Sequence, residues 1–80
     1  MQEQEILNQV EDIFRSVLKK PGLTLSSESS ANDVEGWDSL THVILIDSIE
    51  NHFRIKFKLM EIMGFNSLGD LCECVKKKLL

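Results

Sequence analysis

The chain has 80 residues, of which 42% are hydrophobic, and its 9 Lys and Arg against 13 Asp and Glu give a net charge of −4. A chain of this length makes one small domain, residues 1–80, with little room for a buried enzyme cleft, and its acidic balance argues against nucleic acid as a partner. The N-terminal residues have no signal-peptide pattern, no apolar run reaches the roughly 20 residues of a membrane span, and two cysteines cannot make a disulfide scaffold, so a cytoplasmic location is expected.

The first predicted element is an amphipathic helix that ends at Pro21-Gly22. Acidic residues come early in it and basic residues come late, an order that suits the helix dipole. Its apolar residues follow one stripe at helical spacing, namely Ile6, Leu7, Val10, Ile13, Phe14, Val17 and Leu18.

Residues 21–38 form a long connection that is rich in Ser, Asn, Asp and Gly. A structureless loop of this length is unusual in a compact domain and tends to be functional. Four apolar residues are expected to fix it to the core, namely Leu23, Leu25, Val34 and Trp37.

The second helix is predicted from Ser39 to Phe53. It contains more apolar residues than one buried stripe can use, so some of Leu40, Val43 and Ile44 should be exposed as a docking surface. The residues expected in the core are Leu45, Ile46, Ile49 and Phe53.

The remaining chain is predicted to form a short helical turn at 59–63, ended by Gly64, and a last helix that Asn66-Ser67 caps. The apolar stripe of the last helix is Leu68, Leu71, Cys72, Val75 and Leu79. With no plausible strand pair, the fold is expected to be all-α, a small four-helix bundle of three main helices and one short helix with a long loop between the first two.

No metal site or catalytic set is predicted. Cys72 and Cys74 lie about 200° apart around a helix, so their thiols point in different directions. His42 and His52 are about 15 Å apart along the second helix and cannot share a metal. Ser39 has His42 three residues on, but no third group is evident to orient the imidazole.

The dipeptide Asp38-Ser39 allows two interpretations. Both residue types are favoured helix N-caps, which would make Ser39 only a helix start. Alternatively, an exposed serine hydroxyl there could carry a phosphate, which would meet the positive end of the helix dipole and free N–H groups. Spacing alone leaves both open.

The segment GWDSL at 36–40, followed by THVILIDSIENHFRIKF, resembles the acyl carrier protein family, as do the element order, the length and the acidic charge. The resemblance implies that Ser39 receives a 4′-phosphopantetheine arm from coenzyme A through a Mg²⁺-dependent phosphopantetheinyl transferase. The thiol of that arm would carry acyl groups as thioesters between partner enzymes for fatty-acid, polyketide or related specialised biosynthesis, while the carrier catalyses nothing. The family fold is a four-helix bundle with a short third helix.

The resemblance also implies a partner-binding surface on the second helix of a monomeric carrier. Asp38 and Leu40 flank the serine, Leu40 and Val43 would be apolar contacts, and Asp47 and Glu50 would be acidic contacts for basic docking patches on the transferase and on acyl-loading, condensing or transferase enzymes.

The sequence departs from carriers of fatty-acid synthesis in having Thr41, His42 and Ile44 where acidic residues are frequent. The surface is therefore expected to be less negative and more apolar. The Trp-Asp-Ser-Leu form at 37–40 resembles carriers of specialised pathways, such as polyketide, peptide or lipid-modifying systems. Two alternatives stay open: an aminoacyl or peptidyl carrier that uses the same serine, and an unmodified helical interaction domain.

Overall fold

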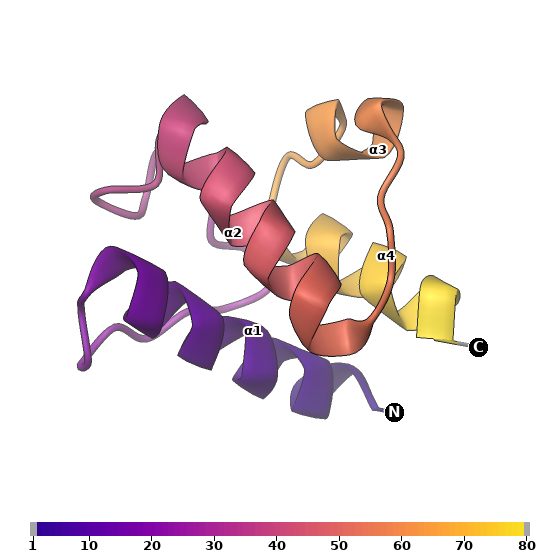
Figure 1. Ribbon diagram of the computed structural model, residues 1–80. Coiled ribbons are helices and arrows are strands. Elements are labelled where there is room, and N and C mark those ends of the chain that lie inside the picture. Colours follow the sequence, from indigo (N-terminus) through magenta and orange to yellow (C-terminus); the bar gives the residue numbers. More distant parts are fainter. Residues whose placement is uncertain (1, 80) are drawn as a thin grey trace.

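The computed structural model describes residues 2–79, which form four helices (Figure 1). They are α1 (Glu3–Leu18), α2 (Ser39–Phe53), α3 (Leu59–Met63) and α4 (Leu68–Leu79). Because no strand occurs in this range, the predicted all-α bundle of three main helices and one short helix is confirmed. No helix within residues 2–79 combines the length and the apolar character needed to cross a membrane.

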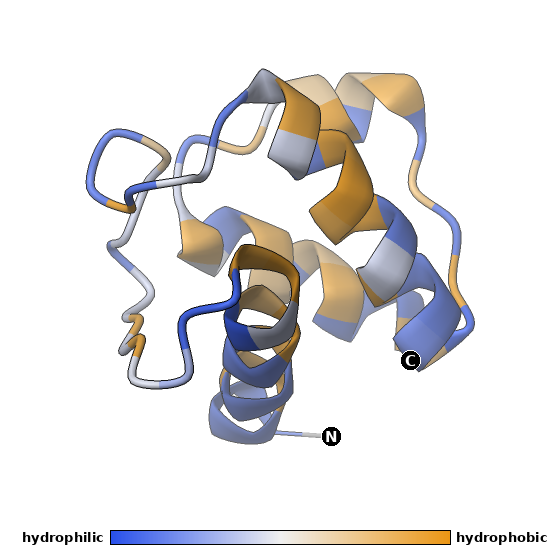
Figure 2. Cartoon of the chain, turned by 60° about the vertical axis from the view of Figure 1, so that its left-hand side comes forward, coloured by the Kyte–Doolittle hydropathy of each residue, from blue (hydrophilic) through white to orange (hydrophobic). Residues whose placement is uncertain are grey.

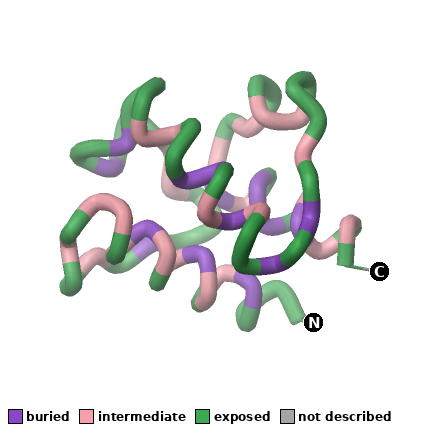
Figure 3. The backbone as a smooth tube through the Cα atoms, in the orientation of Figure 1, coloured by how far each residue is buried: buried purple, intermediate pink, exposed green. Residues whose placement is uncertain are grey.

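The core forms where α1 packs against both α2 and α4, and the buried stretches of the chain face this centre (Figure 3). The four core residues predicted on α2 are all buried. On α1 the predicted stripe divides, because only residues four apart, Ile6, Val10 and Phe14, are fully buried while its other members are half-buried beside them. The remaining buried residues are Leu25, Val34, Trp37, Ile55, Leu68, Leu71, Cys72 and Val75.

α1 ends at Leu18, earlier than the predicted stop at Pro21-Gly22. Lys19 adopts the left-handed conformation with φ 57°, and its N–H closes the helix on the Arg15 carbonyl. The residue before a proline avoids the helical region, so Lys20 cannot continue the helix either.

The long connection is held against α1 by a pair of charged side chains. Arg15 Nε donates to the Leu23 carbonyl at 2.7 Å, and the Leu25 N–H donates to Glu11 Oε2 at 2.7 Å. Glu11 and Arg15 also pair with each other at 2.8 Å, one turn apart on α1. The predicted anchors Leu25, Val34 and Trp37 are buried, whereas Leu23 is half-buried.

The same connection caps the start of α4, which lies within two residues of the predicted position. Asn66 and Ser67 were expected to cap the helix, but backbone carbonyls of the connection do so. The N–H of Leu68 donates to the Ser29 carbonyl at 2.7 Å and that of Gly69 to the Ser27 carbonyl at 2.8 Å. A Cβ at Gly69 would lie 2.9 Å from the Ser27 carbonyl oxygen, so the close approach requires glycine.

We therefore expect Gly69→Ala to destabilise the fold by about 1–3 kcal/mol, as overpacking against a fixed backbone does. The measurement is the urea midpoint of the variant. Gly22→Ala is the matched control, because a Cβ there meets nothing within 4 Å and should leave the midpoint unchanged or slightly higher. An equal decrease of the urea midpoint in both variants would contradict the close approach of Gly69 to the Ser27 carbonyl.

Candidate functional site

Ser39 is the first residue of α2, and the residues on either side of it hold the helix start in place. Asp38 has an extended backbone, and its Oδ1 accepts from the N–H groups of Leu40 at 3.1 Å and Thr41 at 2.9 Å. Thr41 Oγ1 in turn accepts from the Asp38 N–H at 2.8 Å, and its single proton is shared between the Gly36 carbonyl at 2.6 Å and Asp38 Oδ1 at 3.1 Å. The Ser39 side chain is exposed and takes part in none of the hydrogen bonds found within residues 2–79.

The cap keeps Asp38 ionised. Hydrogen bonds to its carboxylate, first from the Thr41 backbone and then from the Thr41 hydroxyl, hold the pKa of Asp38 below its usual value. A carboxylate therefore stands directly beside the serine hydroxyl, at the positive end of α2.

The expectation that a phosphate on Ser39 would meet several free N–H groups is wrong. A helix start leaves four N–H groups without intrahelical acceptors, here those of residues 38–41. Asp38 and Thr41 satisfy three of them reciprocally, which leaves only the N–H of Ser39 itself. A phosphate on Ser39 would thus find one free N–H, that of Ser39, at the positive end of α2.

His42, for which the sequence offers no orienting partner, is fixed on both sides. Trp37 Nε1 donates to His42 Nδ1 at 3.0 Å, and His42 Nε2 lies 3.4 Å from the Ile62 carbonyl of α3. The indole is 7% exposed and meets the Phe14 ring edge-on, with 4.9 Å between the ring centroids. No hydrogen bond joins Ser39 to His42 within the described chain, so the imidazole is not placed as a base for the serine.

A cleft of about 420 Å³ opens beside Ser39. Residues 30–32 of the connection and Trp37 line one side, Ser39 and His42 another, and the end of α3 with Phe65 and Asn66 closes it. The cleft is lined by apolar and by uncharged polar groups, with Asp38 as the charged residue in its lining.

Apolar side chains are exposed on α2 and α3, and both helices contain stretches of hydrophobic residues (Figure 2). On α2 they are Leu40 at 72%, Val43 at 64% and Ile44 at 47% exposure, and these three residues form what we call the α2 apolar surface. On α3 they are Leu59, Met60 and Met63. The predicted excess of apolar residues on the second helix is therefore found on the outside.

The two predicted acidic contacts of α2 differ in their surroundings. Asp47 is exposed, with only a 3.5 Å contact to the Asn51 amide. Glu50 is half-buried, and its Oε2 accepts the Phe57 N–H at 2.8 Å. The Glu50 carboxylate thus fixes the link between α2 and α3, and a partner would have to compete with that bond.

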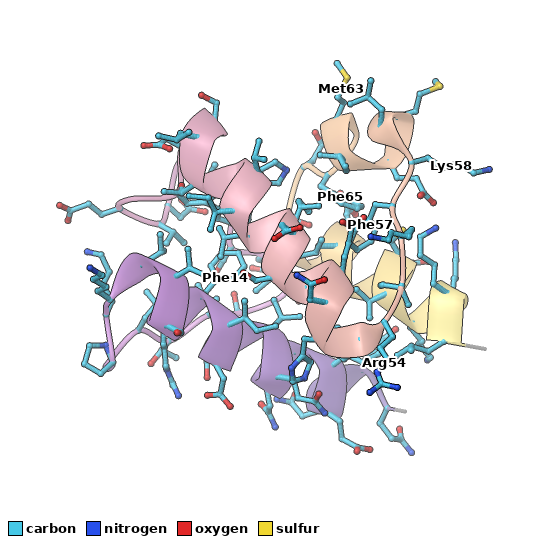
Figure 4. All side chains as sticks on the ribbon, in the orientation of Figure 1. Phe14, Arg54, Phe57, Lys58, Met63 and Phe65 are labelled. Atoms are coloured by element: carbon cyan, nitrogen blue, oxygen red, sulfur yellow. The ribbon has the colours of Figure 1, made fainter. Side chains whose placement is uncertain are left out.

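α3 is attached to α4 through Glu61. Glu61 Oε1 accepts from the Lys58 N–H at 2.7 Å and pairs with Lys78 Nζ at 2.9 Å. These bonds, the backbone one first, lower the pKa of Glu61 to about 2. Beneath α3 the rings of Phe57 and Phe65 meet edge-on, with 5.6 Å between their centroids, and Figure 4 shows where they lie. The Glu61–Lys78 ion pair and this aromatic contact together position α3, whose end forms one wall of the cleft.

Both cysteines are free thiols. Cys72 is buried, and burial raises its pKa to about 11, which keeps the thiol protonated and unreactive. Cys74 is half-buried, and its Sγ donates to Glu61 Oε2 at 3.5 Å. No group of three or more His, Cys, Asp or Glu side chains among residues 2–79 could hold a metal ion.

Comparison with known proteins gives a consistent result. The family described as "Phosphopantetheine attachment site" matches residues 8–75. Three chains of solved structures match, and one is the solution NMR structure of holo acyl carrier protein from Geobacter metallireducens. It is 44% identical, superposes with a TM-score of 0.86, and the match covers 92% of this chain and 85% of the other. Curated proteins give no significant match.

Glu61 generates a pH-dependent prediction. Its folded pKa lies below the ordinary 4.5, so its contribution to stability is fully present above that value and is lost as the pH falls toward about 2. At pH 7, Glu61→Gln should lower the thermal midpoint and the hydrogen-exchange protection of α3, and its difference from the wild type should shrink on acidification.

Glu73→Gln is the matched control, since Glu73 pairs with Lys77 at 3.5 Å on an exposed helix face. Its effect should be small at every pH. A Glu61 variant that matches this control would contradict the role given to Glu61.

Proposed function

Because the chain belongs to the family of phosphopantetheine-attachment proteins, we propose that Ser39 is the residue that carries the 4′-phosphopantetheine arm of this acyl carrier. The observation that carries the assignment is that Ser39 is exposed at a rigid helix start while its hydroxyl is used in no hydrogen bond of the described chain. A serine that served only as a cap would bond the first turn, and here Asp38 does so.

The residues around Ser39 fit a covalently attached group. Ser39 is exposed, a cleft of about 420 Å³ adjoins it, and the hydrogen bonds that hold the helix start do not involve its side chain. Once attached, the arm supplies a terminal thiol on which acyl groups are held as thioesters.

The chain itself is proposed to catalyse neither the attachment nor the acyl transfer. His42 Nδ1 already accepts from Trp37 and no hydrogen bond joins His42 to Ser39 within residues 2–79, while the lowered pKa of the Asp38 carboxylate makes it a weak base for the serine proton. The base and the Mg²⁺ that activate Ser39 must therefore come from the phosphopantetheinyl transferase. Loading and condensing enzymes would then choose the cargo, in fatty-acid, polyketide or related biosynthesis.

We place the partner surface on α2. Leu40 follows the attachment serine directly, and Val43 lies one turn further along the same helix. Asp38 and Asp47 supply negative charge at its borders, and Glu50 contributes only where a partner displaces Phe57. A mainly apolar surface gives weaker electrostatic steering toward basic patches than an acidic one. A monomeric state and a cytoplasmic location belong to the same proposal.

The attachment site is tested by intact mass after incubation with coenzyme A, Mg²⁺ and a promiscuous phosphopantetheinyl transferase. We expect one phosphopantetheinyl group on the wild type and none on Ser39→Ala, which keeps every hydrogen bond of the helix start. Ser48→Ala, the same change elsewhere on α2, should be modified like the wild type. An unchanged wild-type mass would favour an unmodified interaction domain.

The partner surface is tested by the kinetics of the same transferase. Leu40→Ala and Val43→Ala should each raise its KM for the apo-protein about 5- to 30-fold, since truncating an apolar anchor typically loses 1–2 kcal/mol. Leu79→Ala removes an apolar side chain at the end of α4 and should leave KM unchanged. Equal KM values for all variants would move the docking surface away from α2.

A further inference from the structure

Trp37, His42 and Ile62 join three parts of the chain around the cleft beside Ser39. Trp37 ends the long connection, His42 lies on the second turn of α2, and Ile62 belongs to α3. The indole N–H donates to His42 Nδ1 at 3.0 Å, and the opposite ring nitrogen lies 3.4 Å from the Ile62 carbonyl. All three residues line the cleft, so this Trp37–His42 link sets the position of its walls.

The link requires a neutral imidazole. An indole nitrogen can only donate a hydrogen bond, so the nitrogen that receives it must carry a lone pair. The imidazole proton therefore lies on Nε2, where it can be donated to the Ile62 carbonyl. A protonated imidazole has a donor on both nitrogens. Protonation would thus place two donors face to face and end the bond to Trp37.

The indole N–H of Trp37 has no other acceptor among residues 2–79. The ring is 7% exposed and packs on Phe14, which offers no hydrogen-bond acceptor, and within residues 2–79 the indole N–H has His42 as its acceptor. A buried donor that loses its acceptor is strongly disfavoured. The indole should then turn toward water, and the wall of the cleft that it forms should open.

We propose that His42 is a positioning residue that holds the Trp37 wall of this cleft in place while neutral and releases Trp37 when protonated, and that a phosphodiester on Ser39 favours the released form. The second part rests on the proposed attachment at Ser39. Ser39 and His42 are three residues apart on one helix and face the same cleft, so a negative charge on the serine stands close to the imidazole. That charge stabilises the imidazolium.

The other charged groups near the link are the same before and after attachment of a phosphodiester. Asp38, an anion in the lining of the cleft, accepts from the N–H groups of Leu40 and Thr41 and keeps its negative charge. On the connection, Asp33 accepts from Ser30 and Glu35 pairs with Lys20. On α3, Glu61 next to Ile62 pairs with Lys78, and α1 presents the uncharged Phe14 to the indole.

The test uses the only tryptophan of the chain as its own probe. Acrylamide quenching of its fluorescence in the apo-protein should rise severalfold as the pH falls from 8 to 5, the range in which histidine changes charge. His42→Gln, whose amide oxygen accepts at any pH, should give a flat profile. His52→Gln removes the other histidine, which bonds Gln9 at 2.7 Å, and should keep the transition.

A flat wild-type profile, or the same transition in His42→Gln, would overturn the role of His42. After phosphopantetheinylation the midpoint should move to higher pH, and equal midpoints in apo and holo protein would overturn the coupling to Ser39. If the mass shows that no arm is attached, the proposed function fails and the coupling fails with it, while the apo titration still decides the role of His42.

Discussion

The reciprocal hydrogen bonds between Asp38 and Thr41 are the interaction on which the functional site depends. They decide that α2 starts at Ser39 and not a residue earlier or later, and they use the N–H groups that would otherwise attract the serine hydroxyl. A side chain that would otherwise cap its own helix is thereby left outside the network and exposed. The same bonds lower the pKa of the Asp38 carboxylate, so the anion next to the serine in the chain is a weak base.

The position of the start of α2 depends on how the preceding connection is held against the other helices. Glu11 and Arg15 of α1 hold the first part of the connection, and α4 holds its middle through the carbonyls of Ser27 and Ser29. Trp37 then buries its ring against Phe14 just before the cap. A segment of polar composition is thus fixed from two sides, because its backbone groups find partners on helices that the core has already ordered.

Hydrophobic periodicity was sufficient to predict the four helices, the buried residues of α2 and the exposed α2 apolar surface, since these follow from spacing along one helix. Contacts between distant segments could not be predicted in this way. Asn66-Ser67 is a sound local cap, yet Ser27 and Ser29 arrive from 40 residues away and take its place. The Trp37–His42 hydrogen bond could not be predicted for a related reason. Its partners are five residues apart in the sequence, but the indole lies over α2 because the chain turns at Gly36, which has φ 94°. The sequence likewise predicts Glu50 as an exposed acidic residue, because the hydrogen bond from the Phe57 N–H to its carboxylate depends on how the chain turns after α2.

A site that presents an oxygen without activating it makes physical sense for a carrier. The serine hydroxyl of a carrier has to be accessible to the modifying enzyme, which supplies the groups that activate it. Here the side chains next to the serine have structural roles instead, since Asp38 caps the helix start and His42 accepts from Trp37. In the proposed docking, burying Leu40 and Val43 against a partner would exclude water from the end of α2 where the partner brings its catalytic groups. Selectivity in such an arrangement rests on shape and apolar contact more than on charge, as the absence of acidic residues from the first turn of α2 implies.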